Sequence, residues 1–251
     1  MAPQELLRSR RSDYHETLPS DQPQTVIGEA VRKLRMAIMR GDLVPGQKLV
    51  EADLCRELAI SRASVREALR ALQADRLIEL IPNRGPFVAK LDLRGVEEIH
   101  EVWALLTGKA VARFSQIATA DDLAELDLTI QRLKKAVKKR AAIDQLSATN
   151  AFFGYILDRC ENQVLVGFVS SLVLQVNFLR AQSLRQAGWG LRCIAEIEAI
   201  AAAIHSRQPD AARQATERHI GSACTAAKQF ASDQDIGPDA NAQSAHAAAN
   251  I

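Results

Sequence analysis

The chain of 251 residues is 47% hydrophobic and 25% charged, and its formal net charge at pH 7 is +2. These values are typical of a globular protein long enough for two domains, and the charge is too small to indicate a nucleic-acid partner by itself. The sequence shows no apolar signal segment and no run of about 18 uninterrupted apolar residues, which excludes an exported or membrane-spanning chain and predicts a cytoplasmic protein.

The N-terminal part begins with a polar stretch, residues 1–22, that predicts a flexible arm. An apolar face at helical spacing follows, and it ends at Gly41 before a turn at Pro45-Gly46. This face, which predicts a first helix, consists of Ile27, Val31, Leu34 and Ile38.

Residues 49–72 predict two short helices joined by a tight turn. Ser61 stands at the N-cap position of the second helix. The apolar stripe of that helix consists of Val65, Leu69 and Leu72. Arg62 and Arg66 are one helical turn apart on a different face, from which arginines at the start of a helix can reach guanine edges or phosphates. The pattern therefore predicts a helix-turn-helix that reads DNA.

Two strand-like segments, residues 78–81 and 87–90, follow and are separated by the turn Pro82-Asn83-Arg84-Gly85-Pro86. The turn places Arg84 at the tip of a predicted hairpin, where a guanidinium can contact the minor groove or a phosphate. A hairpin beside a helix-turn-helix is a wing. Residues 23–91 are therefore predicted to form a winged helix-turn-helix domain.

The second half, residues 92–231, shows helical periodicity and no strand pattern. The predicted helices span residues 96–117, 121–139 behind a Thr119-x-x-Asp122 capping box, 143–160, 163–186, 191–206 and 210–230. An antiparallel bundle of about six helices buries their apolar faces, so the fold class is mainly α. Residues 232–251 are small and polar and predict a disordered tail.

The residue pattern does not indicate an enzyme, because we find no nucleophile beside a His-acid pair, no phosphate-binding loop and no paired buried carboxylates. The four cysteines are widely spaced and predict reduced, packed thiols. The functions left to compare are a DNA-binding regulator that senses a metabolite and a DNA-binding architectural module.

The N-terminal domain resembles the DNA-binding domain of GntR-superfamily transcriptional regulators over about residues 24–90. The core of the resemblance is Ser61-Arg62-Ala63-Ser64-Val65-Arg66-Glu67-Ala68-Leu69. Ala59 stands where the family usually has the turn glycine. If its backbone is left-handed, alanine costs roughly 1 kcal/mol of folding free energy relative to glycine. The DNA-binding residues predicted from the motifs and the resemblance are Ser61, Arg62, Ser64, Arg66, Arg35, Asn83, Arg84 and Gly85.

The helical half resembles the FCD effector domain of the fatty-acid-regulator (FadR) branch, most closely over residues 203–220 and 120–126. Six helices suggest the vanillate-regulator-like subgroup. The resemblance implies a domain that dimerises and holds a small acid in the bundle core, commonly beside a divalent metal. The residues expected to bind the effector are Asn150, His219, Trp103, Ile197 and Phe153.

The sequence departs from that family at the metal-binding positions. Asn150 stands where the family has an aspartate, and Gly154 and Ile197 stand at two of its histidine positions. His219 is therefore the only family metal ligand that this sequence retains. One imidazole and one carboxamide cannot supply the roughly three good donors that a divalent ion needs. We therefore expect no metal and no other cofactor.

Without a metal, Asn150 and His219 are expected to form a neutral polar pair in an apolar pocket, with Trp103 filling or lining the cavity. A core histidine without any ligand is an equally good interpretation of His219. His100 and His205 are expected at the surface. The aromatic residues interpreted as core are Trp103, Phe152, Phe153, Phe168 and Phe178.

The resemblance implies a ligand-responsive regulator, commonly a repressor, that binds a palindromic double-stranded DNA operator as a homodimer. Half-sites about 34 Å apart would match its two recognition helices. The effector is expected to be an organic acid or another small metabolite, and no membrane partner is expected. The alternative is a DNA-binding regulator or architectural protein whose effector pocket has lost ligand and metal binding.

Overall fold

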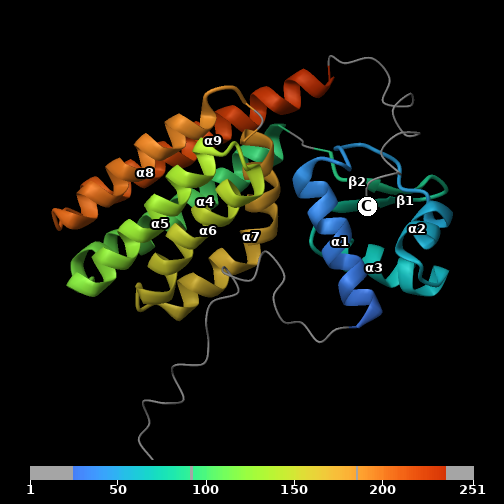
Figure 1. The fold of residues 1–251 in the computed structure, drawn as a ribbon, viewed down its shortest axis with the longest axis horizontal. Coiled ribbons are helices and arrows are strands. Elements are labelled where there is room, and N and C mark those ends of the chain that lie inside the picture. The colour runs from blue at the N-terminus through green and yellow to red at the C-terminus, as the bar shows by residue number, and fades with distance from the viewer. Residues whose placement is uncertain (1–24, 91–92, 185, 236–251) are drawn as a thin grey trace, which may run out of the picture.

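The computed structural model describes residues 25–90, 93–184 and 186–235, which form a small mixed domain beside a helical bundle (Figure 1). The predicted arm, residues 1–22, lies outside these ranges. The elements of the small domain are α1 (Val26–Arg40), α2 (Glu51–Leu58), α3 (Arg62–Ala74), β1 (Ile78–Ile81) and β2 (Gly85–Val88). The elements of the bundle are α4 (Leu93–Ile117), α5 (Ala120–Lys138), α6 (Ala142–Arg159), α7 (Gln163–Ser183), α8 (Trp189–His205) and α9 (Pro209–Asp235).

The three helices of the small domain begin and end where the sequence predicts. Thr25 caps α1 by accepting a hydrogen bond from Gly28 N, and Gly41 ends it in the left-handed conformation. The turn between α2 and α3 bends at Ala59, which has φ 53° and ψ 42°. This residue therefore adopts the strained left-handed geometry that the family's glycine accepts more easily. The fully buried side chains of Leu34, Ile38, Leu72 and Leu77 form the centre of the core.

The wing hairpin differs from the prediction in its second strand. The first strand has the predicted bounds, but β2 spans Gly85–Val88 and not residues 87–90, so the loop holds three residues instead of five. Pro86 is compatible with this strand because successive backbone amides point to opposite edges of a strand. Val88 N donates to Gln47 O, on the edge away from β1, and the nitrogen of Pro86, two residues earlier, faces that same edge. The ladder with β1 therefore loses no donor.

The bundle contains the six predicted helices within residues 93–184 and 186–235. The capping box is confirmed, because Thr119 Oγ1 accepts from Asp122 N while Asp122 Oδ2 accepts from Thr119 N. The last helix, α9, extends to Asp235, so the predicted tail starts too early by four residues. Residues 236–251 lie outside the described ranges.

Helix α7 is apolar enough by length and composition to cross a membrane, with a mean hydropathy of 1.7 in its most apolar window. It packs instead against α4, α6, α9 and α1, and 56% of that window is buried inside the structure. It is therefore the core helix of the bundle.

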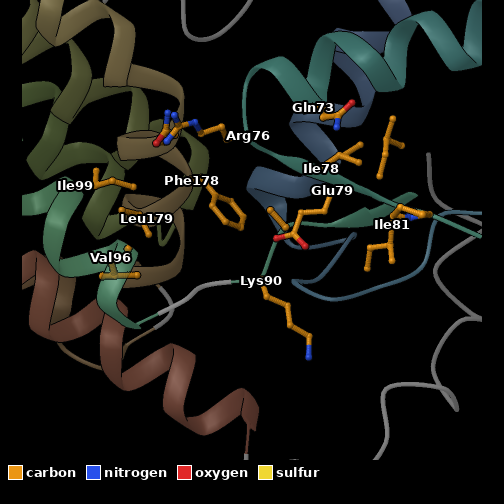
Figure 2. Close-up of a pocket in the computed structure, with 15 residues that line it drawn as sticks. Gln73, Arg76, Ile78, Glu79, Ile81, Lys90, Val96, Ile99, Phe178 and Leu179 are labelled. Carbon is orange, nitrogen blue, oxygen red and sulfur yellow. The ribbon is translucent and has the colours of Figure 1, made fainter. Parts of the chain in front are cut away.

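The two domains meet along α6 and α7. Leu146, Phe178 and Ala181 of the bundle are buried in the same apolar cluster as the core of the small domain. Beside this contact lies an open cavity of about 660 Å³, whose walls include Ile78 of β1 on one side and Leu179 of α7 on the other (Figure 2). A movement of α7 would therefore displace Phe178 and Ala181, which pack against the core of the small domain.

Candidate functional site

The start of α3 forms the centre of the candidate DNA surface. Ser61 Oγ accepts a hydrogen bond from Ser64 N at 3.1 Å and lies 2.9 Å from Ser64 Oγ. Ser61 is thereby confirmed as the N-cap, and both hydroxyls stabilise the first turn of the helix. A hydroxyl that contacted DNA would have to keep its hydrogen bond in the cap at the same time. The neighbouring arginines are exposed at the start of this ordered helix.

Arg62 and Arg66 are both exposed on α3. Arg66 Nε lies 3.0 Å from Glu51 Oε2 of α2, and the arginine side chain is 62% exposed. An exposed ion pair of this kind contributes little to stability, about 0–1 kcal/mol, so a DNA phosphate or a guanine edge can replace Glu51 at small cost. The pair holds the guanidinium at the junction of the two helices until DNA arrives.

Arg35, a further predicted DNA-binding residue, is partly buried in an ion pair. Its guanidinium donates to Asp75 Oδ2 at 2.8 Å, and the two side chains are only 17% and 23% exposed. Asp75 is the C-cap residue of α3, so the pair connects α1 to the end of the recognition helix. The contact of Arg35 with DNA stays a prediction, and the structure gives this residue a positioning contact inside the domain.

The wing tip presents Arg84 as predicted. Asn83 has φ 61° and Gly85 has φ 92°, and these two left-handed residues make the short turn possible. The guanidinium lies over the ring of Phe87 at 5.3 Å from its centroid, and the residue is exposed. The hairpin therefore projects one positive charge beside the recognition helix.

We expect Arg84→Ala to weaken binding to specific and non-specific DNA alike. If Arg84 contacts a phosphate, the slope of log affinity against log salt should fall by about one unit. Fluorescence anisotropy titrations over a range of salt concentrations measure both quantities. Arg132→Ala, which removes an exposed charge from α5 in the bundle, is the control and should change neither. An Arg84 variant with wild-type affinity and slope would remove the wing from the DNA surface.

A second candidate site lies inside the bundle, where a small cavity of about 20 Å³ has room for one water molecule. Its walls come from α6, the end of α7, α8 and α9. The residues that line it are Leu146, Thr149, Arg180, Leu184, Trp189, Cys193, His219 and Ala223.

The predicted neutral pair of Asn150 and His219 is replaced by two contacts with charged groups. His219 Nδ1 donates to Glu196 Oε2 at 2.8 Å, and Asn150 Oδ1 accepts from the Arg180 guanidinium. Burial lowers the pKa of His219, while the Glu196 carboxylate acts in the opposite direction. Sequence reasoning assigned neither the guanidinium of Arg180, which lines the cavity, nor the carboxylate of Glu196, which lies beside it.

Arg180 is the residue that sequence reasoning missed. It is 6% exposed, and its Cζ lies 4.4 Å from the ring centroid of Trp103 and 5.1 Å from that of Phe153. The structure brings this arginine from α7 to the ring of Trp103 on α4. A single arginine within the apolar run of residues 172–181 is the sequence signal that could have identified it.

The other predicted pocket residues are buried, but they do not line the cavity. Trp103 and Ile197 are 0% exposed and belong to the bundle core, so Trp103 fills space instead of lining the cavity. Phe153 is buried too and stacks on the His219 ring, with centroids 5.8 Å apart.

Two simpler interpretations are corrected by the structure. His100, expected at the surface, is 4% exposed and bonds through Nδ1 to Val96 O, and burial lowers its pKa to about 4. Phe168, expected in the core, is 62% exposed on α7. His205 is at the surface as predicted, where Nε2 lies 3.0 Å from Asp127 Oδ1.

The side chains around the cavity do not fit a divalent metal. Within the described ranges, no group of three or more His, Cys, Asp and Glu residues could hold one. Cys193 faces the cavity, but burial raises the pKa of its thiol to about 11, so the thiolate that binds metals is scarce. Besides His219, the family's ligand positions hold a carboxamide, a glycine and an isoleucine.

Comparisons with known proteins agree with this division into two domains. Residues 27–88 match the family model described as bacterial regulatory proteins, gntR family, and residues 98–222 match the FCD domain. The chain is 29% identical to the galactonate operon transcriptional repressor of Escherichia coli, over 77% of this chain and 93% of that protein.

The chain is also similar to a second regulator over part of its length and to a solved structure in its fold. An uncharacterised helix-turn-helix regulator of Agrobacterium vitis is 34% identical over 91 residues, so the chain spans 53% of that relative. The solved structure of McbR/YncC from Escherichia coli superposes with a TM-score of 0.66 at 22% identity, covering 82% of this chain and 99% of that one. This likeness supports the fold of the winged domain and the bundle.

Proposed function

Because the chain belongs to the GntR family of bacterial transcriptional regulators and carries an FCD domain, we propose that it is a ligand-responsive repressor that binds a palindromic operator as a homodimer. This family regulates transcription and is not a class of enzymes. The observation that carries the proposal is the exposed surface formed by Arg62 and Arg66 at the start of α3 and by Arg84 at the wing tip. As a transcriptional regulator, the protein would act in the cytoplasm.

Support for a homodimer comes from exposed apolar side chains on two helices that pack against each other, α4 and α7. We call this set the α4–α7 surface; it consists of Val102, Leu105, Val164 and Phe168, which are 47%, 62%, 72% and 62% exposed. Large apolar side chains exposed on two packed helices favour an interface between copies of the chain. A second copy of the chain can cover both helices at once, because a two-fold axis brings the same surface to both partners.

The dimer gives the operator its expected form. Two recognition helices related by a two-fold axis fit successive major grooves when their centres are about 34 Å apart, so the operator should be an inverted repeat. DNA selected from the organism's genome by the purified protein tests this proposal. Recovery of a short inverted repeat near promoters supports it, and random recovery contradicts it.

We also expect the protein to work without a metal. Purified, untagged protein should contain far less than one zinc, nickel or manganese ion per chain, because His219 is the only residue of a ligand type left at the family's positions. Elemental analysis measures this directly. Treatment with a chelator should leave both the melting temperature and the DNA affinity unchanged. One metal per chain, lost in His219→Ala, would contradict the expectation.

A second candidate function is favoured by the small volume of the bundle cavity, about 20 Å³. A regulator whose pocket no longer binds a metabolite would bind its operator with constant affinity. A ligand that binds only the folded protein raises the melting temperature, so thermal melting with a metabolite library separates the two functions. Stabilisation by one compound supports the repressor that responds to a ligand.

A further inference from the structure

Arg180 places a positive charge inside the bundle, close to the family's metal position. Its guanidinium donates to Asn150 Oδ1 and lies against the faces of Trp103 and Phe153. Asn150 stands where the resemblance implies a metal-binding aspartate. The guanidinium is therefore beside the position at which related domains hold a divalent cation.

The electrostatics of the small cavity favour an anion. Arg180 is the only one of its eight described lining residues with a formal charge at neutral pH, because burial keeps His219 neutral. The adjacent acid, Glu196, is 23% exposed and accepts the Nδ1 hydrogen of His219. Trp103 Nε1 is a further buried donor beside the guanidinium, and it has no hydrogen-bond partner among the described residues.

We propose that Arg180 takes the place of the family's metal ion and binds the carboxylate of a small organic acid effector. This inference rests on the proposed function, in which the helical domain senses a metabolite. A guanidinium suits the task because its planar fork offers two parallel N–H donors to the two oxygens of a carboxylate. The cavity has room for about one water molecule, so the acid has to displace lining side chains such as Leu184 and Trp189, which flank the connection between α7 and α8.

The walls of the cavity connect it to the DNA-binding domain. Leu146 and Leu184 line the cavity, and both also pack in the apolar cluster of the small domain. Phe178 and Ala181, on either side of Arg180 in α7, are buried in that cluster too. An acid that moves Leu184 therefore changes the contact between the bundle and the winged domain, which gives binding a route to alter DNA affinity.

Thermal melting in the presence of chelator tests the anion site. The probes are acetate, lactate and pyruvate, each compared with its neutral amide. We expect the acid that fits to raise the melting temperature of the wild type, whereas its amide does not. Arg180→Gln should bind that acid at least about tenfold more weakly, because it loses charge-assisted hydrogen bonds. Arg192→Gln removes an exposed arginine near the start of α8 and should behave like the wild type.

Arg180→Lys provides a second variant that keeps the buried charge, in case Arg180→Gln does not fold. It should melt cooperatively and bind the acid more weakly than the wild type, because an ammonium ion lacks the planar fork. Equal stabilisation of the wild type and both Arg180 variants would overturn the proposal. Stabilisation by acid and amide alike, or by none of the three acids, would overturn it as well.

Operator binding separates this inference from the proposed function. In Arg180→Gln the acid should no longer change the DNA affinity that this variant shows without acid. Leu184→Ala should still be stabilised by the acid, while the effect of the acid on DNA affinity is reduced. A wild type that is stabilised by an acid through Arg180 but binds no operator would contradict the proposed function and leave the anion site standing.

Discussion

Replacing either Arg62 or Arg66 by alanine should weaken specific operator binding by about 1–3 kcal/mol, which is roughly a 5- to 150-fold rise in the dissociation constant. Both side chains are exposed at the start of α3, on a different face from the buried Val65, Leu69 and Leu72. Neither truncation opens a cavity in the core, so the melting temperature should stay close to that of the wild type. Mobility-shift titrations with an operator fragment measure the change in affinity.

The control for these variants is Arg56→Ala, which removes the same charge from an arginine of α2 that is 79% exposed. It should reduce binding only by the general loss of one positive charge, and by a similar factor on any sequence. If both Arg62→Ala and Arg66→Ala bound the operator as tightly as the wild type, the assignment of α3 as the recognition helix would be wrong.

A charge at Phe168 should separate the dimer into monomers. This side chain is 62% exposed in the single chain, so Phe168→Asp should fold normally, yet in a dimer formed by the α4–α7 surface the carboxylate would be buried without a partner. We expect the dimer dissociation constant to rise at least about 100-fold, since truncating a central aromatic residue alone often costs 2 kcal/mol or more. Analytical ultracentrifugation measures this constant.

Loss of the dimer should also weaken DNA binding, because each monomer carries one recognition helix and contacts one half-site. Leu191→Asp is the matched control: this leucine is 71% exposed at the start of α8 and lies outside the α4–α7 surface. It should leave both the dimer and the operator affinity unchanged. A dimeric Phe168→Asp protein with wild-type DNA affinity would place the interface elsewhere on the chain.

Local sequence signals predicted most of the fold. Hydroxyl caps such as Ser61, left-handed turn positions such as Ala59 and apolar periodicity depend on neighbouring residues, so they can be interpreted without the tertiary structure. The bundle helices consequently begin within three residues of their predicted starts. The start of the second strand was predicted two residues too late, because five turn-forming residues were assigned to the loop. Gly85 and Pro86 in fact belong to the strand.

The pocket was harder to predict because its contacts join distant parts of the chain. Helix α7 is apolar on nearly all sides, so periodicity could not show that Phe168 faces outward or that Arg180 faces inward. Histidines give a similarly weak signal, since His100 is buried by packing between helices and not by its own neighbours. Sequence comparison identified Asn150 and His219 correctly as buried residues, but it could not supply their partners, Arg180 and Glu196.

Footprinting of the selected operator, combined with the mass of the protein–DNA complex, tests the central claim most directly. The account predicts two chains per operator and two protected half-sites whose centres are about 34 Å apart, in an inverted repeat. A complex with one chain on a single protected half-site would contradict it.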